Sequence, residues 1–381
     1  MKKFITLFEK TENFHLIKDV GQIPFLMHHY FGYDSMIVTY KNNDSYPYLD
    51  DEVQGLKLKF IPKVKLGRYS LSALVYLFLN AKNIDVLHLF HHREKTYLNF
   101  LMYKWRNPNG IAFLKSDMGL NSIKEYDGFV PKKRPKYAIR QWLFDKVLPK
   151  LDVLTIETQE GYEYIYNRYP NYADKMFFMP NGMNIERMYA LTPVKTFTDK
   201  ENIILTVGRI GAPEKNNELL LSAIEKLELG DWKVVFIGPI EKGFESVIEE
   251  FFQKNPHLQE KVVFTGAIYD RQLLFEWYAR SKIFCLTSIE ESFGFVLIEA
   301  MAYANYVVTT PISSANEITD FGKCGAIVSG EIELSEQLRV LIEGSNQVEV
   351  IAELARKRTL SRYDWLTLLQ KLDSFMAVGK I

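Results

Sequence analysis

The feature that most constrains the fold is an alternation of short apolar runs with segments of helix length, which continues through almost the whole chain. Several runs, such as 84–90 (IDVLHLF) and 202–207 (NIILTV), are apolar almost without interruption rather than at every second residue. Such strands are typical of parallel sheets covered by helices on both faces. The alternation therefore predicts an α/β, doubly wound architecture in which crossover helices join the strands.

The predicted strands form two series, separated by the polar stretch 186–202. We interpret that stretch as the link between two Rossmann-like domains, which also suits a chain of 381 residues. In such domains ligands bind beyond the carboxyl ends of the strands, so a cleft between the domains is the expected active site. The strands are predicted at 3–8, 35–40, 56–61, 84–90, 111–115, 151–157 and 176–179, and then at 202–207, 232–237, 261–265, 282–287 and 305–309.

Composition excludes several classes of protein. Two cysteines, Cys285 and Cys324, are too few for a disulfide scaffold or a four-cysteine zinc site, and they fit a reducing compartment. The longest apolar run, 71–81, is too short to span a bilayer. Lys2 and Lys3 before a short apolar run faintly suggest a signal peptide, but charged residues end the run and no cleavage site follows. We expect a cytoplasmic protein that does not cross a membrane.

The net charge of zero conceals an asymmetry. Residues 1–195 contain 28 Lys and Arg against 20 Asp and Glu, a net charge of +8, and the remaining 19 and 27 give −8. The basic half includes 131–150, where a Lys/Arg cluster runs into a possible amphipathic helix. The favoured interpretation is a surface helix that packs its apolar face on the core, and the alternative is contact with an anionic membrane. The residues on that face are Ile139, Trp142, Leu143 and Val147.

Two loops that follow predicted strands carry the candidate chemistry. After the strand at 202–207 come Gly208, Arg209 and Lys215, just before a helix that is predicted to begin near residue 216. The glycine lets a ligand approach the backbone, and two cations near a helix N-terminus can bind a polyanion. This is neither a Walker P-loop nor a dinucleotide-binding glycine motif. Taken alone, the stretch is equally well a connecting loop with two solvated cations.

The second loop follows the strand at 282–287. Glu291, Ser292, Phe293 and Gly294 precede a predicted helix in which Glu299 lies among apolar residues. A buried carboxylate without a partner costs several kcal/mol, about 2–7 for polar groups in general, so something must pair with it. One interpretation is a capping carboxylate plus a glutamate satisfied by backbone groups. The other is a diphosphate ligand bearing hydroxyl groups, with cations and amides on the phosphates and carboxylates on the hydroxyls.

These stretches together resemble the retaining nucleotide-sugar glycosyltransferases of the GT-B fold, glycosyltransferase family four. The similarity covers most of the second half and adds a Pro-Asn-Gly turn in 177–184 and the stretch SRYDW at 361–365, which resembles the start of a last helix that returns to the first domain. The resemblance implies domains at 1–192 (acceptor) and 193–360 (donor), with a returning helix at 361–381.

The resemblance also implies roles for individual residues. Arg209 and Lys215 bind and neutralise the donor diphosphate, Glu291 contacts the donor sugar, and Glu299 accepts the ribose hydroxyls. Ser292, Phe293 and Gly294 contribute backbone contacts, beside Gly208. Gly21 in the loop after the first strand approaches the diphosphate, although the family usually has a glycine pair there. Arg209, Lys215 and Glu291 are the predicted catalytic residues, with no metal ion and no cofactor.

The chain departs from the family at the acceptor side. Ser116 stands where the family commonly has histidine, followed by Asp117, and His91 or His92 could instead line the acceptor cleft. We interpret each of these histidines as a polar residue of a surface loop with no role in the reaction. In retaining transfer the departing phosphate can take the acceptor's proton, so a side-chain base is not obligatory.

The sequence therefore predicts a retaining transferase that uses a nucleotide diphosphate sugar of the UDP or GDP type. The expected acceptor is a glycan or lipid-linked molecule of bacterial cell-surface polysaccharide synthesis, with peripheral contact at the inner membrane face as a hypothesis and no nucleic acid. The rivals are a GT-B nucleotide-sugar epimerase, a sugar-phosphate synthase and a non-catalytic GT-B partner subunit.

Overall fold

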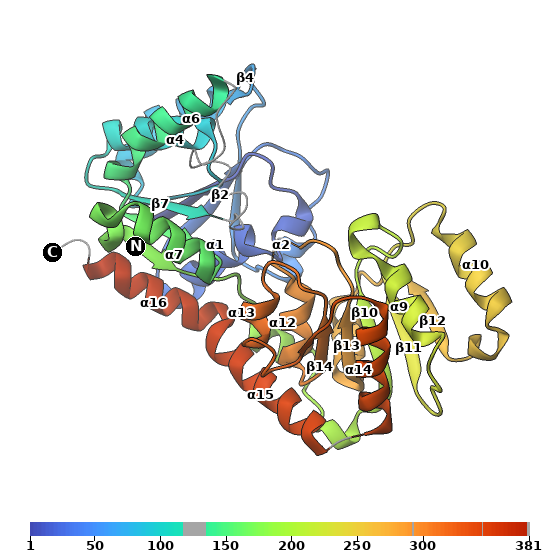
Figure 1. Cartoon of the computed structure of the whole chain (residues 1–381). Coiled ribbons are helices and arrows are strands. Elements are labelled where there is room, and N and C mark those ends of the chain that lie inside the picture. Colours follow the sequence, from blue (N-terminus) through green and yellow to red (C-terminus); the bar gives the residue numbers. More distant parts are fainter. Residues whose placement is uncertain (117–134, 292, 345, 379–381) are drawn as a thin grey trace. The chain divides into compact units, whose positions relative to one another are not determined.

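The protein consists of two compact α/β units. The computed structural model describes residues 1–116, 135–291, 293–344 and 346–378. One unit comprises Met1–Met183 with Trp365–Ile381, and the other comprises Asn184–Asp364. Each contains a parallel sheet flanked by helices (Figure 1). The doubly wound architecture predicted from the alternating runs is confirmed.

The first unit contains seven parallel strands in the order β3-β2-β1-β6-β7-β8-β9. All seven strands predicted in the first half of the sequence are present in this sheet. Register is set at the centre, where Phe4 of β1 lies opposite both Ser35 of β2 and Val86 of β6. The strands are β1 (Lys3–Leu7), β2 (Asp34–Thr39), β3 (Lys57–Phe60), β6 (Val86–Phe90), β7 (Ile111–Ser116), β8 (Val153–Ile156) and β9 (Met176–Phe178).

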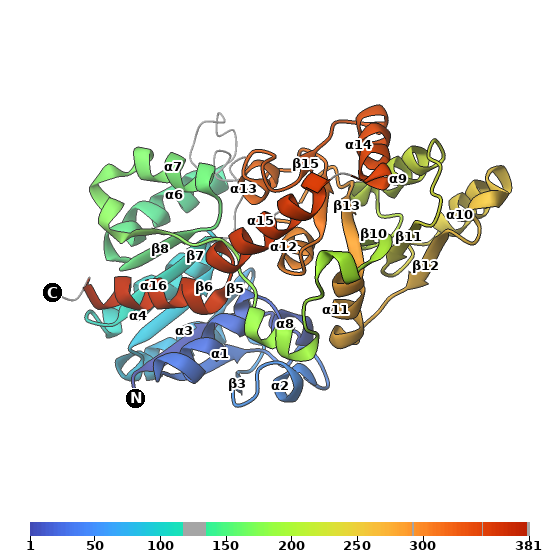
Figure 2. The same cartoon turned by 90° about the horizontal axis from the view of Figure 1, so that it is seen from below.

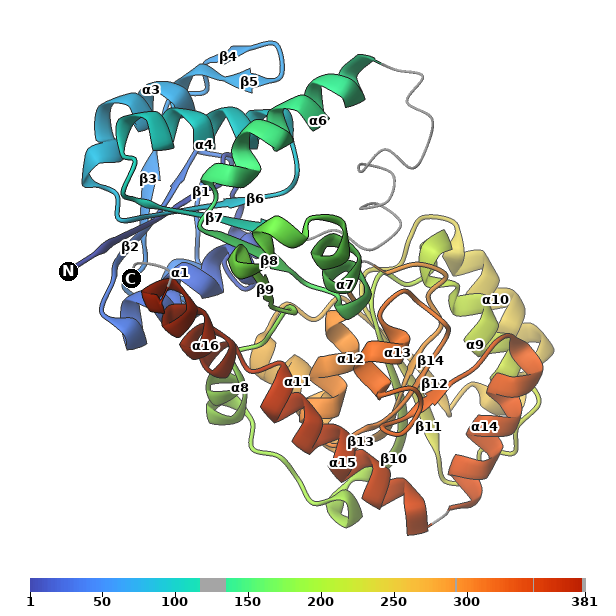
Figure 3. The same cartoon turned by 60° about the vertical axis from the view of Figure 1, so that its left-hand side comes forward.

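Alternate residues of these strands face opposite sides of the sheet, so the unit has a core on each face. Ile5 and Leu7 pack into one core, whereas Phe4 packs into the other. Figure 3 shows α3, α4 and α6 on the face of the sheet that carries the first of these cores. Helices of the first core are α3 (Leu71–Asn80), α4 (Glu94–Arg106), α6 (Pro135–Val147) and α7 (Gln159–Arg168), and those of the second are α1 (Asp19–Phe31) and α16 (Trp365–Val378).

The last helix returns to the first unit, as the resemblance implied. α16 lies beside α1 (Figure 2), and the Tyr33 hydroxyl donates a hydrogen bond of 2.7 Å to Asp373 Oδ1. The Trp365 N–H donates to the Met183 carbonyl at 2.9 Å, so the two chain crossings lie side by side.

The unit boundaries differ from those predicted at 192/193 and 360/361. They lie at 183/184 and 364/365. The stretch interpreted as a polar link contains a helix, α8 (Ile185–Leu191), and the Tyr303 hydroxyl donates to the carbonyls of Met188 and Thr192 at 3.1 and 3.2 Å. These bonds attach the start of the predicted link to the second unit.

The second unit contains six parallel strands in the order β12-β11-β10-β13-β14-β15. Five were predicted, and the two-residue β15 was not. The strands are β10 (Glu201–Val207), β11 (Lys233–Ile237), β12 (Val262–Gly266), β13 (Ser281–Leu286), β14 (Tyr306–Thr309) and β15 (Ala326–Ile327). The helices are α9 (Asn217–Ile224), α10 (Phe244–Lys254), α11 (Arg271–Arg280), α12 (Phe295–Ala302), α13 (Ala315–Thr319), α14 (Glu331–Glu343) and α15 (Asn346–Arg362).

Two local features of the first unit depart from the expectations. A small antiparallel hairpin, β4 (Lys65–Leu66) and β5 (Tyr69–Ser70), was not predicted. In α6, Leu143 and Val147 are buried, but Ile139 and Trp142 are 49% and 59% exposed. The expectation that all four pack on the core is therefore wrong for two of them, because the buried stripe of α6 runs through Phe144 instead.

Candidate active site

The two loops singled out in the sequence meet at the carboxyl ends of the strands of the second sheet. β10 and β13 are neighbouring parallel strands, so their carboxyl ends lie together. The loops are joined by backbone contacts, because the Ile289 N–H donates to the Glu214 carbonyl at 2.8 Å. The Thr287 hydroxyl also donates to the Lys215 carbonyl at 3.0 Å. The two loops therefore lie against each other.

Lys215 and Glu291 are brought into direct contact across this junction. The Lys215 ammonium forms an ion pair with Glu291 Oε1, and the two side chains are only 18% and 16% exposed. The Ser288 hydroxyl donates to the same oxygen at 2.8 Å. Gly208 lies beside them, since a Cβ there would be 3.6 Å from Lys215 Cε. This pair joins one predicted cation to one predicted acid.

Arg209 lies in the same loop but has other partners. Its guanidinium pairs with Glu214 and approaches Glu241 Oε1 at 3.4 Å, and its side chain is 56% exposed. An exposed arginine held only by surface carboxylates can exchange them for another anion at low cost. No described contact joins Arg209 directly to Lys215 or Glu291, so convergence of the two cations on one anion remains a prediction.

Gly294 forms the start of α12 in the left-handed conformation, with φ of +84°. A Cβ there would also approach Ile312 Cδ1 at 3.2 Å. Both the positive φ and this close contact therefore favour glycine at position 294. The loop before it is fixed by the Ser314 hydroxyl on the Phe293 carbonyl and by the Ser313 hydroxyl on the Glu291 carbonyl at 3.0 Å. The Phe293 ring is buried, and Ser292 lies outside the described residues.

The buried carboxylate of Glu299 has a hydrogen-bond partner. The Tyr278 hydroxyl, from α11, donates to Glu299 Oε2 at 3.0 Å. Burial raises the pKa of the Glu299 carboxyl, while the charge of Arg271 and the Tyr278 hydrogen bond oppose that shift. Tyr278 and Arg271 carry no sequence signal of this role, because both belong to an ordinary amphipathic stretch. Glu299 has no described contact with Lys215 or Glu291.

Gly21 occupies a different place from the one predicted. It is buried inside helix α1 rather than in a loop, and a Cβ there would lie 2.2 Å from the Leu16 carbonyl oxygen. Close packing of α1 on the preceding turn therefore explains this glycine. The expected approach of a loop at Gly21 to the diphosphate is corrected accordingly.

A buried charged cluster at the carboxyl edge of the first sheet was missed by the sequence analysis. Lys115 of β7 is fully buried, and its ammonium lies 3.1 Å from Asp19 Oδ2, 3.6 Å from Glu157 Oε2 and 2.8 Å from Asn181 Oδ1. Asn181 comes from the Pro-Asn-Gly turn and also donates to Glu157 at 2.8 Å. A lysine inside the apolar strand AFLKS was the signal that could have revealed it.

The residue at the family's histidine position is also buried. Ser116 is 1% exposed, and its hydroxyl has no hydrogen-bond partner among the described residues. Asp117 lies outside the described residues. His92 Nδ1 lies 3.0 Å from the Tyr97 hydroxyl, which anchors that histidine locally. His91 has a positive φ of 64° and lines a pocket.

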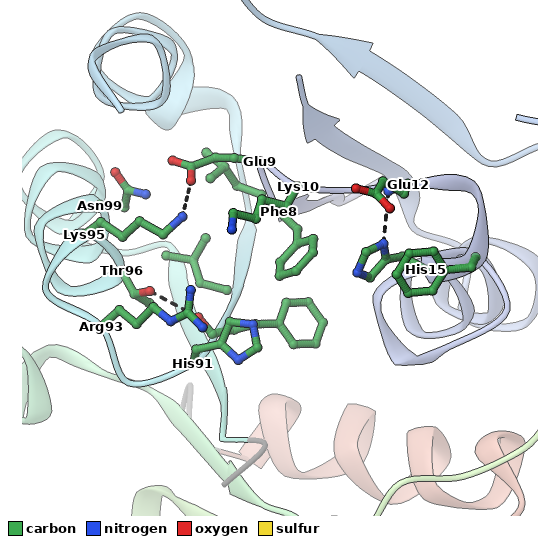
Figure 4. Close-up of a pocket in the computed structure, with 14 residues that line it drawn as sticks. Phe8, Glu9, Lys10, Glu12, His15, His91, Arg93, Lys95, Thr96 and Asn99 are labelled. Atoms are coloured by element: carbon green, nitrogen blue, oxygen red, sulfur yellow. Dashed lines mark hydrogen bonds and ion pairs between the residues drawn. The ribbon is translucent and has the colours of Figure 1, made fainter. Parts of the chain in front are cut away.

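That pocket, of about 180 Å³, lies where β1 and β6 end in the first unit (Figure 4). Glu9 is its most informative residue, because it is 6% exposed and forms an ion pair with Lys95. Its second oxygen, Oε1, has no hydrogen-bond partner in the described part of the chain. A buried carboxylate oxygen without a partner is suited to a hydroxyl donor on a ligand. The other polar and aromatic residues that line the pocket are Phe8, Lys10, Glu12, Phe14, His15, Phe90, His91, Arg93, Thr96 and Asn99.

Within the described ranges, no group of three or more His, Cys, Asp or Glu side chains is arranged to hold a metal ion. The same ranges contain no helix with both the length and the apolar character of a membrane span.

Comparison with known proteins identifies the fold and a family that the second unit resembles. The structure resembles that of HepE from Anabaena, solved in complex with UDP, with a TM-score of 0.71, 15% sequence identity, and coverage of 99% of this chain and 100% of that one. A likeness at this identity establishes the fold, which is GT-B. Residues 191–358, nearly the whole second unit, match the family of glycosyl transferases group 1.

Two curated relatives extend the comparison. The probable sucrose-phosphate synthase of Thermosipho melanesiensis is 28% identical over 242 residues, which are 61% of this chain and 56% of that protein's length. The N-acetylgalactosamine-N,N'-diacetylbacillosaminyl-diphospho-undecaprenol 4-alpha-N-acetylgalactosaminyltransferase of Campylobacter jejuni is 25% identical over 263 residues, 66% of this chain and 69% of that one. The matched stretch thus spans little more than half of the synthase.

Proposed function

We propose that the protein transfers a sugar from a nucleotide diphosphate sugar, of the UDP or GDP type, to a hydroxyl-bearing acceptor with retention of anomeric configuration. The observation that carries the proposal is the Lys215–Glu291 ion pair at the junction of the loops after β10 and β13. This ion pair supports the proposal because an ammonium group suits a phosphate and a carboxylate suits sugar hydroxyls. UDP in the HepE complex supports the choice of a nucleotide diphosphate.

In the proposed reaction the acceptor oxygen forms a bond to the anomeric carbon while that carbon's bond to the diphosphate oxygen breaks. The acceptor's proton passes to a departing phosphate oxygen, so no side-chain base is needed. Lys215, Arg209 and the N–H groups at the start of α12 neutralise the charge that develops on the diphosphate. Glu291 orients the sugar through its hydroxyls, and Glu299 accepts the ribose hydroxyls.

The acceptor is proposed to bind in the pocket of the first unit. Glu9 Oε1 provides an acceptor for a sugar hydroxyl, and the exposed ring of Phe14 (44%) offers a surface for the apolar face of a sugar. Lys10, Lys95 and Arg93 surround the same pocket and suit a phosphate group on the acceptor. Lipid diphosphate-linked glycans and sugar phosphates share this chemistry, as the names of the two relatives illustrate. If the acceptor is a lipid diphosphate-linked glycan, the protein would act in bacterial cell-surface polysaccharide synthesis at the inner membrane face.

The test measures sugar transfer and donor binding in Lys215→Ala, with Lys226→Ala as the matched control because Lys226 also forms an ion pair but is 50% exposed on another surface. Loss of one charge-stabilising group is expected to reduce kcat/KM by roughly 10²–10³. Unchanged transfer in Lys215→Ala would refute the site. The anomeric configuration of the product, read from its proton coupling constant, tests retention.

The same assay separates the rivals. Turnover of the donor without any acceptor indicates an epimerase. If the protein binds nucleotide but transfers sugar to none of the acceptors tested, it is a non-catalytic partner. A thermal-shift panel of nucleotides and nucleotide sugars identifies the donor, because a ligand at 100 times its Kd adds about 2.7 kcal/mol to the free energy of unfolding.

A further inference from the structure

Helix α3 of the first unit is apolar on the side that faces water. Its buried side carries Ala73 and Leu77, which pack on the sheet. Its outward side carries residues at helical spacings of four, seven and eight from the first, with no charged residue anywhere in the helix. A helix that is apolar all round normally has a second apolar neighbour. The outward residues are Leu71 (38% exposed), Val75 (55%), Phe78 (42%) and Leu79 (68%).

The β4–β5 hairpin and the end of α4 extend this surface. The Leu71 N–H donates to the Val64 carbonyl at 3.1 Å, which fixes the hairpin to the start of α3. Val64 and Leu66 are 51% and 66% exposed. At the other end, the exposed ring of Trp105 stacks at 6.0 Å on Phe78. We call the surface formed by Val64, Leu66, Leu71, Val75, Phe78, Leu79 and Trp105 the α3 face; Figure 3 shows β4, β5 and α3 together.

The charges of the segment 57–84, which carries the hairpin and α3, have one sign. Every charged residue from 57 to 84 is a cation, and cations alternate with apolar residues along Lys63-Val64-Lys65-Leu66. Arg106 adds a guanidinium 4.6 Å from the Phe78 ring centroid. The acid nearest the hairpin in the described contacts, Glu94, is 4% exposed and lies 3.6 Å from Arg68. The cations of the segment are Lys57, Lys59, Lys63, Lys65, Arg68 and Lys82.

We propose that the α3 face docks on a lipid bilayer that contains anionic headgroups, with its apolar side chains at the acyl boundary and its cations at the phosphates. Apolar residues interleaved with Lys and Arg are the pattern that such an interface selects, and long cationic side chains reach the headgroups while their stems stay apolar. A second copy of the chain fits less well, since a two-fold interface would set these cations against themselves. The surface differs from the one predicted at 131–150, of which Lys132, Lys133 and Arg134 lie outside the described residues.

The inference deepens the proposed function, and it rests on that function only for the idea of a membrane-borne acceptor. It can be tested separately, because vesicle binding requires neither donor nor acceptor. The measurement is co-sedimentation of the full chain with phosphatidylcholine vesicles and with vesicles that also contain phosphatidylglycerol. Two glutamates are introduced on the α3 face, Val75→Glu with Leu79→Glu. The control carries Val340→Glu with Ile332→Glu on α14, where the wild-type side chains are equally exposed at 55% and 68%.

We expect the wild type and the α14 control to sediment with the anionic vesicles, and the α3 variant to bind them at least about tenfold more weakly. Lys63→Glu with Lys65→Glu should lose binding mainly at low salt, and Lys242→Glu, an exposed lysine of the second unit, should not. Circular dichroism and thermal unfolding check that each variant folds. Transfer to a water-soluble acceptor should be unchanged in the α3 variant, which separates a failure of docking from a failure of the active site.

Equal vesicle binding by the α3 variant and the α14 control would overturn the inference. So would a concentration-dependent dimer in sedimentation velocity that Val75→Glu abolishes, because the face would then be an interface between copies. Absence of vesicle binding by the wild type, together with stable capture of an acidic protein, would assign the face to a protein partner instead.

Discussion

At the residue scale, two charged side chains lie inside apolar segments, one in each unit. Glu299 is paired with the Tyr278 hydroxyl, and Lys115 is paired with Asp19, Glu157 and Asn181. The sequence revealed Glu299 as an anomaly but could not name its partner, because Tyr278 lies on another helix. Lys115 carried the same anomaly within AFLKS. A charge inside an apolar strand is therefore a usable signal, whereas its partner depends on tertiary contacts.

Lys115→Met should destabilise the first unit strongly. It leaves the carboxylates of Asp19 and Glu157 without their buried counter-charge, at a cost of about 3–5 kcal/mol in the free energy of unfolding. Lys57→Met removes an ion pair with Asp34 whose lysine side chain is 62% exposed, and it should cost less than about 1 kcal/mol. Urea unfolding measures both, and equal stability of the two variants would contradict the structural role of the cluster.

Glu299→Gln should raise stability at neutral pH and weaken donor binding. Because burial raises the folded-state pKa of Glu299, the charged form is disfavoured in the folded protein, and its cost appears as pH rises through that pKa. The stability gained by Gln should therefore shrink as pH falls toward the unfolded pKa of about 4.3. Loss of a charge-assisted hydrogen bond to the ribose should weaken the donor by about 1.5–3 kcal/mol.

Unfolding at several pH values and donor titrations measure these two effects. Glu353→Gln, on α15 of the same unit, is the control for a general change of charge. A stability gain that does not change with pH, or donor affinity that equals that of the control, would count against the role of Glu299.

At the scale of elements, the strands were predictable and their order was not. Nearly uninterrupted apolar runs identified all the strands of the first sheet and five of the six in the second. The neighbourhood of β10 and β13, which brings Lys215 to Glu291, depends on where each crossover helix places the next strand. Two-residue strands such as those of the β4–β5 hairpin leave no periodic pattern. Periodicity predicted the helix α6, but it did not predict which of the apolar residues of α6 face the core.

Gly294→Ala tests the start of α12. The alanine must keep the φ of +84° that Gly294 has, and its Cβ would press on Ile312. We therefore expect a loss of about 1–2 kcal/mol in the free energy of unfolding and a marked fall in sugar transfer. Gly243→Ala at the start of α10 is a close match, with a φ of +94° and nothing within 4 Å of the new Cβ. It should lose similar stability and keep its transfer activity. Equal transfer in the two variants would remove the α12 N-terminus from the donor site.

At the scale of the whole molecule, two units of opposite charge are expected to carry two substrates. The acidic second half contains the few cations assigned to the donor, and the basic first half contains the pocket with Glu9 and Lys95. The sequence predicted this division and the return of the last helix. It could not predict the pocket, because Glu9 and Lys95 are far apart in the chain and meet only through the pairing of β1 with β6.

The central claim is that a diphosphate binds where the loops after β10 and β13 meet. The most direct measurement is a crystal structure of the protein with the nucleotide diphosphate that gives the largest thermal shift. We expect diphosphate oxygens within hydrogen-bond distance of Lys215 Nζ, the Arg209 guanidinium and the N–H groups at the start of α12, and ribose hydroxyls on Glu299. A nucleotide bound elsewhere, with the Lys215–Glu291 pair facing solvent, would contradict the account.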